Sequence, residues 1–590
     1  MERSLVCFFI SMIIGDLCGV LLSNSIELDV AIATSFLLFM FLFCEKKLFI
    51  FVLLFFAIGF SSLEIYFNAQ LPVESELNVR IISKSEFYTT VAYMGRKINV
   101  KGELKNTKIG ENILIKGYFN RNIDYNYGVI GSYKVTKIES ISSDFISKLY
   151  SYKDELYKKF DSEIGKNLGS KIMAIAFGNS SEISKDNKND FKRLGIVYAI
   201  CVSGLHMLII FRVLSLCFNR EISMVLAIIY TLFTGCQPST VRSLIMIAIL
   251  KYSKRLSKNY DVYSALSLAG MILLLFKPYY ILDVGFMLSF LATLGIALFY
   301  KKIYKALYKL PEKINESISI CISAQSISLP YVLYIMKSFS LGSVLGNIFL
   351  IPIFSVLVVL GNVALVLSPI KVLFRLICVP IYILLTALNG GMSILLRLTP
   401  PIVYIPLIYA IFIAYLYFCY ILMRKGHKNV KYAAMLFFVI LLINQYRFIP
   451  EISYLDLKSG YGFIVRSKWK TILISSYNIN DRDEKEELQG RFFVNEFITN
   501  ANDNYDILID NKYYLSIPKS QGKNKITLQV KNSKDKNNII YFYNNGIKYY
   551  GINSLQNYDI INEDADEKKS DLPKDNVDLE IINNRVLVIK

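Results

Sequence analysis

Long apolar runs, broken by short polar loops, dominate the chain. Many of them approach the roughly 20 residues that an α-helix needs to cross a bilayer. Three such runs precede residue 69, and the others fall between residues 195 and 449. The pattern predicts a polytopic α-helical membrane protein. Its expected spans are 4–22, 29–44, 48–66, 195–217, 222–236, 238–250, 262–277, 282–300, 317–336, 343–367, 373–397, 402–422 and 432–448.

Polar regions with shorter β-type runs interrupt this pattern. Between 71 and 141, segments such as FYTTVAY and ILIKGYF are separated by Gly and Asn, which predicts a small β-barrel or sandwich, with an OB-like barrel as one form. From Asp144 to Phe177, apolar residues recur at helical spacing and predict an amphipathic helix. We therefore expect an N-terminal transmembrane segment (1–69), an OB-like β domain (70–142), an amphipathic helix and linker (143–194), a transmembrane channel domain (195–449) and an α/β or β-rich C-terminal domain (450–590).

Composition supports the membrane assignment and gives it an orientation. Hydrophobic residues make up 54% of the 590 residues, charged residues 19%, and the net charge is +19. Basic clusters begin near Lys251, Lys301 and Arg424, and basic loops of membrane proteins face the cytoplasm. This rule places both β-type domains on the extracellular side. The nine cysteines lie in or beside apolar runs, which argues against a disulfide framework and against a thiolate metal site.

Four polar interruptions lie within the expected spans: SGLH (203–206), PSTVR (238–242), LDVGFMLSF (282–290) and LGSVLGNIFLIP (341–352). Polar groups at membrane depth are costly unless they face protein or water, so they indicate functional positions. The candidate channel and motif residues are Ser203, Gly204, His206, Pro238, Arg242, Asp283, Gly285, Phe286, Ser289, Gly342, Asn347 and Pro352.

Each candidate also has a structural interpretation. Arg242 is compatible with a snorkelling side chain near a helix end, Asp283 with an N-cap, and the glycines with close helix packing. His206 is one of two histidines, the other being His427, and an isolated histidine in a membrane is more often a hydrogen-bonding partner than a metal ligand. SGLH lacks the glycine pair that flanks a hydrolase nucleophile. We therefore expect no catalytic residue, metal or cofactor.

The four motifs, in this order, resemble the ComEC family of competence proteins, which form the inner-membrane channel for transforming DNA. The resemblance rests on GIVYAICVSGLHM, PSTVRSLIM, KPYYILDVGFMLSFLATLGI and the LGN and IP pair that ends at Pro352. It covers about residues 195–367, and the regions before them agree with the family's layout. The family's SGLH-type motif is usually preceded by another histidine, whereas this chain has Tyr198 at that position.

Many members of that family end in a metallo-β-lactamase-like domain, and residues 452–476 resemble its opening strand pair. The usual DVGQGD-like turn is replaced by the sequence DLKSG at 456–460, and no histidine follows His427 to form the metal-binding signature. A two-metal hydrolase needs those imidazole ligands. The resemblance thus implies a truncated, degenerate lactamase-like region at 450–590, and we expect the protein not to be an enzyme.

The function implied by the resemblance is transport of single-stranded transforming DNA across the cytoplasmic membrane during natural competence. The implied partners are single-stranded DNA, membrane lipid, a DNA receptor and a cytoplasmic translocation ATPase, and a homo-oligomer is left open. A polyanion needs a hydrated passage with cationic or hydrogen-bonding groups and stacking surfaces at its mouth. The candidate lining groups are Arg242, Asn347, Ser203 and His206, with Tyr and Lys residues of 71–141 as receiving contacts.

Two other functions compete with this hypothesis. Arg242 and Asp283 within interrupted spans also fit a secondary transporter of a small anionic solute. A membrane hydrolase that uses the C-terminal domain is the third hypothesis, and the absence of histidine from residues 450–590 argues against it.

Overall fold

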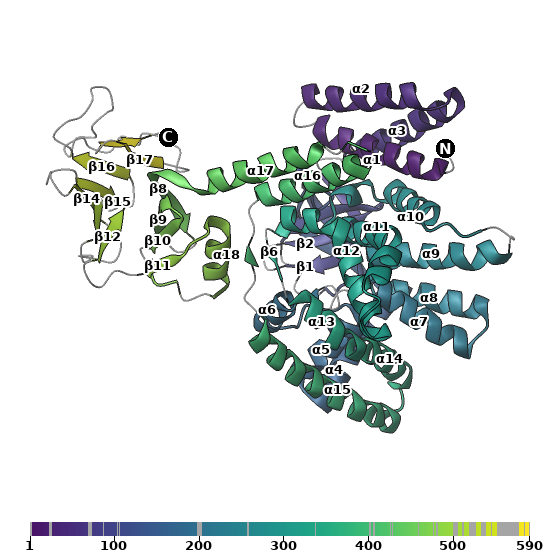
Figure 1. The fold of residues 1–590 in the computed structure, drawn as a ribbon. Coiled ribbons are helices and arrows are strands. Elements are labelled where there is room, and N and C mark those ends of the chain that lie inside the picture. Colours follow the sequence, from purple (N-terminus) through teal and green to yellow (C-terminus); the bar gives the residue numbers. More distant parts are fainter. Residues whose placement is uncertain are drawn as a thin grey trace. The chain divides into compact units, whose positions relative to one another are not determined.

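The computed structural model places the chain in two compact units, residues 1–329 with 340–401 and residues 330–339 with 402–590 (Figure 1). The described residues are 3–22, 26–68, 74–85, 88–102, 104, 107–197, 203–255, 259–336, 338–340, 342–399, 403–404, 407–424, 426–427, 429–457, 460–475, 477–479, 482–499, 505–509, 513–517, 527–532, 539–543, 546–550, 578–582 and 585–588.

Three apolar helices open the first unit: α1 (Ser4–Leu22), α2 (Ile26–Phe43) and α3 (Lys46–Phe67). Helices α1 and α3 pack very closely, because glycines lie where they meet. A Cβ atom on Gly59 would come within 2.3 Å of the Met12 carbonyl oxygen. Such small-residue contacts let membrane helices approach each other.

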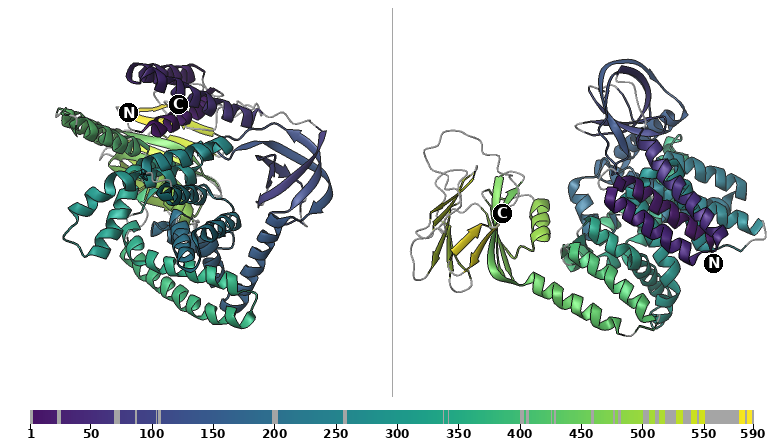
Figure 2. Two further views of the ribbon diagram at one scale, coloured as in Figure 1. Left: turned by 90° about the vertical axis from the view of Figure 1, so that its right-hand side faces the viewer. Right: turned by 90° about the horizontal axis from the view of Figure 1, so that it is seen from above.

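A closed five-stranded barrel follows, with the strand order β1-β2-β3-β5-β4 (Figure 2). Its paired strands are antiparallel, except that β3 and β5 run parallel. Residues such as Val91, Ile98 and Ile113 are buried in it. The expected small β-barrel is therefore confirmed. The strands are β1 (Glu74–Lys84), β2 (Thr89–Tyr93), β3 (Arg96–Lys101), β4 (Asn112–Asn120) and β5 (Val129–Ser142).

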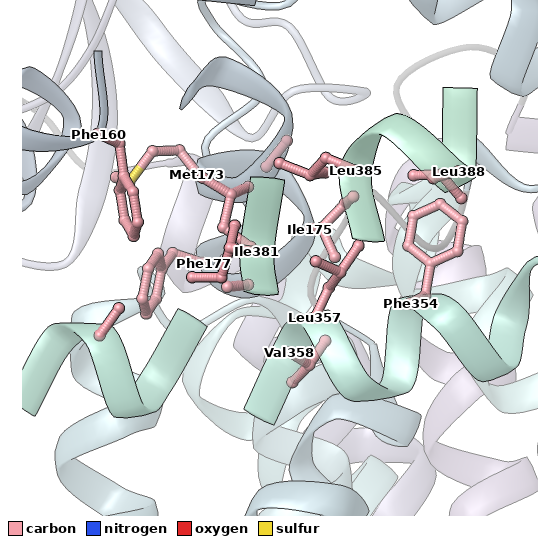
Figure 3. Close-up of a cluster of buried hydrophobic side chains, with 14 of the residues drawn as sticks. Phe160, Met173, Ile175, Phe177, Phe354, Leu357, Val358, Ile381, Leu385 and Leu388 are labelled. Atoms are coloured by element: carbon pink, nitrogen blue, oxygen red, sulfur yellow. The ribbon is translucent and has the colours of Figure 1, made fainter. Parts of the chain in front are cut away.

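The single amphipathic helix expected over 144–177 is instead two helices, α4 (Phe145–Ile164) and α5 (Lys166–Phe177). They separate at Gly165, whose φ of +83° favours glycine. Helix α5 is buried along most of its length, where it packs with α14 (Ile351–Leu367) and α15 (Lys371–Leu398) (Figure 3). Helix α6 (Lys185–Arg193) then leads into the helical body.

The helical body of the first unit runs from α7 to α15. The span expected over 195–217 begins only at Gly204, because Gly195 turns the chain with a φ of +64° and Ser203 occupies the N-cap of α7. The elements are α7 (Gly204–Cys217), α8 (Arg220–Phe233), α9 (Pro238–Arg255), α10 (Val262–Phe276), the 3-10 helix η2 (Pro278–Leu282), α11 (Val284–Ala306), α12 (Glu312–Met336), α13 (Ser343–Phe349), α14 and α15.

Five described helices, α1, α3, α11, α12 and α15, are long and apolar enough to cross a bilayer. Helices α13 and α14 meet at a 51° bend and together form a sixth candidate, a broken span or a re-entrant loop. Other expected spans correspond to shorter apolar helices, among them α7 and α10. The expectation of a mostly helical protein with several apolar helices is confirmed, and these helices are those of a multi-pass membrane protein.

The second unit holds the end of α12, the short β6–β7 ladder, two apolar helices and two sheets. One sheet has the order β11-β10-β9-β8-β17-β18 and the other the order β12-β13-β14-β15-β16. The elements are β6 (Ser338–Phe339), β7 (Val403–Tyr404), α16 (Leu407–Arg424), α17 (Val430–Gln445), β8 (Arg447–Leu457), β9 (Gly460–Lys468), β10 (Lys470–Ser475), α18 (Arg482–Phe492), β11 (Glu496–Thr499), β12 (Tyr505–Ile509), β13 (Tyr513–Ile517), β14 (Thr527–Asn532), β15 (Ile539–Tyr543), β16 (Gly546–Tyr550), β17 (Asp578–Ile582) and β18 (Arg585–Val588).

Candidate functional site

The SGLH motif forms the start of α7, and His206 joins it to α5. Nδ1 of His206 lies 3.1 Å from the backbone nitrogen of Ser203 and 3.0 Å from its Oγ, while Nε2 lies 2.8 Å from the Ile175 carbonyl oxygen. Because a carbonyl oxygen only accepts, we assign the proton to Nε2, so that Nδ1 accepts from Ser203. Both ring nitrogens are therefore occupied in a side chain that is 3% exposed. These contacts are those of a positioning histidine.

Arg242 lies in the first turns of α9, the helix that Pro238 opens. Its side chain is buried, and its Nη1 donates to Oγ1 of Thr293 on α11. Nη2 lies 3.4 Å from Oγ of Ser243, and Nε has no hydrogen-bond partner. Among the described residues, no carboxylate forms an ion pair with this guanidinium. The hydrogen-bond partners of this buried cation are therefore all neutral.

The LSF end of the third motif supplies the α11 side of this cluster. The carbonyl oxygen of Ser289 accepts from Oγ1 of Thr293 at 2.8 Å, so the Thr293 hydroxyl is free to accept from Arg242. The Phe290 ring centre lies 5.8 Å from the guanidinium carbon and 4.3 Å from the Phe286 ring centre. An aromatic face stabilises a nearby cation.

The start of the third motif has a different role from its end. Asp283 is the N-cap of α11, where its Oδ1 accepts from the backbone nitrogen of Phe286 at 2.7 Å. Gly285 is exposed in the first turn, and a Cβ there would lie 3.2 Å from Oδ1 of Asp283. The N-cap interpretation of Asp283 therefore describes its observed contacts.

The KPYY segment that precedes Asp283 docks the β-barrel onto the helical body. Gly128, in the loop between β4 and β5, is in close contact with the Tyr279 ring, because a Cβ on Gly128 would come within 2.4 Å of the ring. Tyr66 at the end of α3 donates to the Gly128 carbonyl oxygen at 2.9 Å. The Nζ of Lys97 lies 4.5 Å from the Tyr279 ring centre, and burial, together with the nearby Lys277 ammonium, lowers the pKa of Lys97. The barrel is thus fixed by side-chain contacts.

The fourth motif contacts the turn that precedes the first motif. A Cβ atom on Gly195 would lie 2.4 Å from Cβ of Ser343, and one on Gly346 would lie 2.6 Å from the Leu194 carbonyl oxygen. A Cβ on Gly342 would lie 2.9 Å from the Arg193 carbonyl oxygen. These glycines allow the backbone of α13 to touch the segment at residues 193–195.

Asn347 and Pro352 lie at the same bend. Nδ2 of Asn347 donates to Sγ of Cys321 at 3.0 Å, and Nε2 of Gln325 donates to Oγ of Ser343 at 3.1 Å. Pro352 is exposed in the first turn of α14, where a proline loses no helical hydrogen bond. No described contact joins these residues to Arg242.

The candidates therefore fall into three groups. Ser203, Gly204 and His206 are continuous with the Arg242 cluster, because a Cβ on Gly204 would lie 2.9 Å from Nη2 of Arg242. Gly342, Asn347 and Pro352 form the second group, along α13 and its bend with α14. Asp283 and Gly285 form the third group at the start of α11, where Asp283 is the N-cap. Tyr198 lies outside the described residues.

Four groups around Arg242 and His206 were not among the predicted site residues: Thr293, Ser243, Phe290 and the Ile175 carbonyl oxygen. Thr293 follows Ser289 by four residues, the spacing that places two side chains on one helix face, so it was detectable. Ser243 is the neighbour of Arg242 in sequence. The Ile175 carbonyl oxygen could not be predicted, because any residue offers a backbone carbonyl. Among the described residues, no three His, Cys, Asp or Glu side chains are grouped to hold a metal ion.

Residues 175–428 match the family model described as Competence protein. This part of the chain, 254 of its 590 residues, is similar to competence proteins. The match begins at Ile175, the residue that accepts from His206, and ends beyond His427, so the matched region is longer at both ends than the four motifs.

Two curated relatives are similar to parts of the chain. ComE operon protein 3 of Bacillus subtilis (strain 168) is 25% identical over 254 residues, which cover 41% of this chain and 32% of the relative. An uncharacterized protein of Aquifex aeolicus (strain VF5) is 28% identical over 156 residues, which cover 25% of this chain and 38% of the relative. The matched parts thus span about a third of each relative. No solved structure matches the chain.

Proposed function

We propose that this chain is a competence protein that takes part in DNA uptake by conducting single-stranded DNA across the cytoplasmic membrane. The observation that carries the proposal is the Arg242 cluster, where α7, α9 and α11 meet around a buried guanidinium without a carboxylate partner among the described residues. A buried cation without a counter-charge is costly. A phosphate of a passing strand would supply that charge, and guanidinium groups bind phosphates well.

The barrel is the proposed receiving surface on the extracellular side. Its order, β1-β2-β3-β5-β4, and its closure suit an OB-type barrel, a fold that binds oligonucleotides through strands 2 and 3 and neighbouring loops. Tyr88 and Tyr118 are exposed on it at 39% and 48%, and tyrosine rings stack on unpaired bases. The contacts of Gly128 and Lys97 with Tyr279 would hold this surface against the helical body.

The proposed partners follow from this role. They are single-stranded DNA, membrane lipid, a DNA receptor outside the membrane and a translocation ATPase on the cytoplasmic side, with self-association as a further proposal. The extracellular placement of the barrel and of the C-terminal unit rests on the basic loops near Lys251, Lys301 and Arg424.

The experiment is uptake of labelled DNA into a nuclease-protected form in a strain that lacks the gene, with the gene restored on a plasmid as control. We expect uptake to disappear in the deletion strain and to return with the plasmid. Uptake at the wild-type level in the deletion strain would refute the proposal.

The second candidate function is transport of a small anionic solute, and the compactness of the Arg242 cluster favours it. Thr293, Ser243 and Phe290 surround the guanidinium closely, which suits one small oxyanion as well as one phosphate of a strand. Saturable flux of inorganic phosphate or sulfate into vesicles that contain the purified chain, without competition by oligonucleotides, would favour the second candidate.

We also propose that the C-terminal unit does not cleave DNA, since no histidine follows His427 to serve as a metal ligand. The purified chain, incubated with single- and double-stranded DNA and with Zn²⁺ or Mn²⁺, should leave both intact. Cleavage that a chelator abolishes, in a preparation free of other nucleases, would refute this part.

A further inference from the structure

An exposed group of aromatic side chains lies at one end of the first sheet of the second unit. Trp469, the sole tryptophan of the chain, is 57% exposed, and Phe448 is 72% exposed. The Tyr446 ring centre lies 5.3 Å from that of Trp469 and 4.6 Å from that of Phe448, both in edge-to-face geometry. These three residues are called the aromatic collar below. Large apolar side chains that cluster and stay exposed indicate a contact surface.

The collar follows directly after an apolar helix. Helix α17 ends at Gln445, Tyr446 is its C-cap, and β8 begins at Arg447. Register places Arg447 opposite Lys468, so the turn at Trp469 lies at the same end of the sheet as the start of β8. The collar therefore surrounds the point where the chain leaves α17.

The length of α17 decides where this point lies in a bilayer. Its 16 residues rise about 24 Å, which is less than the roughly 30 Å of a hydrocarbon core. Ile443 near its end is 56% exposed, and Ile449 beyond it is 39% exposed, so apolar surface continues past the helix end. A helix that is too short draws its flanking residues into the boundary of the bilayer.

We propose that α17 crosses the bilayer and that the aromatic collar lies in the headgroup interface at its end, where it anchors the C-terminal sheet. Tyrosine and tryptophan prefer this zone, because their rings are apolar while the hydroxyl and the indole N–H reach polar groups. The surface is a lipid-binding one and is independent of DNA transport.

The cations beside the collar indicate which lipids it accepts. Nε of Arg447 lies 3.2 Å from Oε2 of Glu451, and Nζ of Lys470 lies 2.9 Å from Oε2 of Glu496. Because these two cations already have carboxylate partners, they add little to the affinity for anionic lipid. Insertion of the aromatic rings rather than charge then accounts for the binding. Phosphatidylcholine, which has no net charge, is therefore enough for the collar to bind the membrane.

Trp469 makes the proposal measurable in the full chain. The purified protein is placed in phosphatidylcholine vesicles, with lipid brominated near the glycerol end of its acyl chains as quencher. The matched control is the double variant Trp469→Phe/Tyr477→Trp, which moves the fluorophore just past the opposite end of β10, about 20 Å away along the strand. Acrylamide quenching of both proteins reports exposure to water.

Brominated lipid should quench Trp469 at least about twofold more strongly than the tryptophan of the control variant, as interfacial placement requires. The quenching should persist without anionic lipid. Equal quenching of the two proteins would overturn the proposal. Protection of Trp469 from both lipid and acrylamide would also overturn it, because a protein contact would then cover the collar.

Discussion

Gly204 leaves no room for a side chain beside Arg242. A Cβ atom at Gly204 would lie 2.9 Å from Nη2 of Arg242 and 2.6 Å from Oγ of Ser243. Both atoms are ends of side chains, so a methyl group would displace them without breaking backbone contacts. The SGLH motif at the start of α7 therefore limits where the guanidinium of Arg242, which belongs to α9, can lie.

Gly204→Ala should reduce DNA uptake by about tenfold. A displaced guanidinium would lose part of its contact with the strand phosphate, and a loss of roughly 1.4 kcal/mol corresponds to a tenfold lower rate. The amount of protein in the membrane should be unchanged. Gly390→Ala on α15 is the matched control, because a Cβ there meets nothing within 4 Å. Full uptake by Gly204→Ala would contradict the role assigned to this contact.

His206→Ala should lower the free energy of unfolding by about 1–3 kcal/mol, the cost of leaving a buried partner such as the Ile175 carbonyl oxygen unpaired. Thermal unfolding in detergent measures the effect. His427→Ala is the control, since His427 is exposed and should give no change. A stable His206→Ala protein that fails in uptake would instead assign His206 to the transport path.

The N-cap of α4, Asp144, should make the stability of the protein depend on pH in the acidic range. The Ser147 backbone N–H and then the Arg80 guanidinium lower the pKa of Asp144. The folded pKa lies below the unfolded one of about 3.9, so this stabilisation is complete above that value and is lost as the pH falls through the folded pKa. Asp144→Asn should therefore be less stable than wild type near neutral pH, and the difference should shrink in acid.

Limited proteolysis between the barrel and α4, over a range of pH, measures this difference. Glu139→Gln on β5 is the control, as that side chain is exposed. A difference between wild type and Asp144→Asn that stays constant into strong acid would show that the carboxylate charge does not contribute.

Lys153 should make the stability of the protein depend on pH in the alkaline range. Burial lowers its pKa to about 8, while its Nζ lies 3.3 Å from the Phe177 carbonyl oxygen. Below pH 8 both states carry the proton and the folded state bears the cost of a buried ammonium. As the pH rises from about 8 toward the unfolded pKa of about 10.4, that cost is relieved.

Lys153→Met should therefore raise the thermal unfolding temperature at pH 7, by an amount on the order of 1 kcal/mol in stability, and its advantage over wild type should shrink above pH 8. Lys148→Met on an exposed position of α4 serves as the control. An advantage that does not change between pH 7 and pH 10 would show that burial of the charge is not the cause.

The sequence was sufficient for the elements whose pattern is local. The barrel follows from short β-type runs such as ILIKGYF, separated by Gly and Asn turn signals, and Ile113 and Ile115 of this run are buried in it. The N-cap interpretation of Asp283 was also available, since Asp precedes an apolar run there.

The rest depended on long-range contacts. The hydropathy pattern placed Gly195 in the same helix as α7. It could not show that Gly195 adopts a positive φ where it packs against Ser343. It also predicted one amphipathic helix over 144–177, although the α5 part lies in the core, where it packs with α14 and α15. The partner of His206 could not be read from spacing, since Ile175 is distant in sequence and offers only its backbone carbonyl. Spacing places Thr293 on the helix face of Ser289, but it does not show that this face meets Arg242.

The central claim is that the Arg242 guanidinium meets the phosphates of the moving strand. The direct measurement is nuclease-protected DNA uptake in the deletion strain that carries wild type, Arg242→Lys or Arg242→Met at equal membrane levels. We expect Arg242→Met to reduce uptake by about tenfold or more, as for loss of one charged contact, and Arg242→Lys to retain an intermediate level. Wild-type uptake by Arg242→Met would contradict the account.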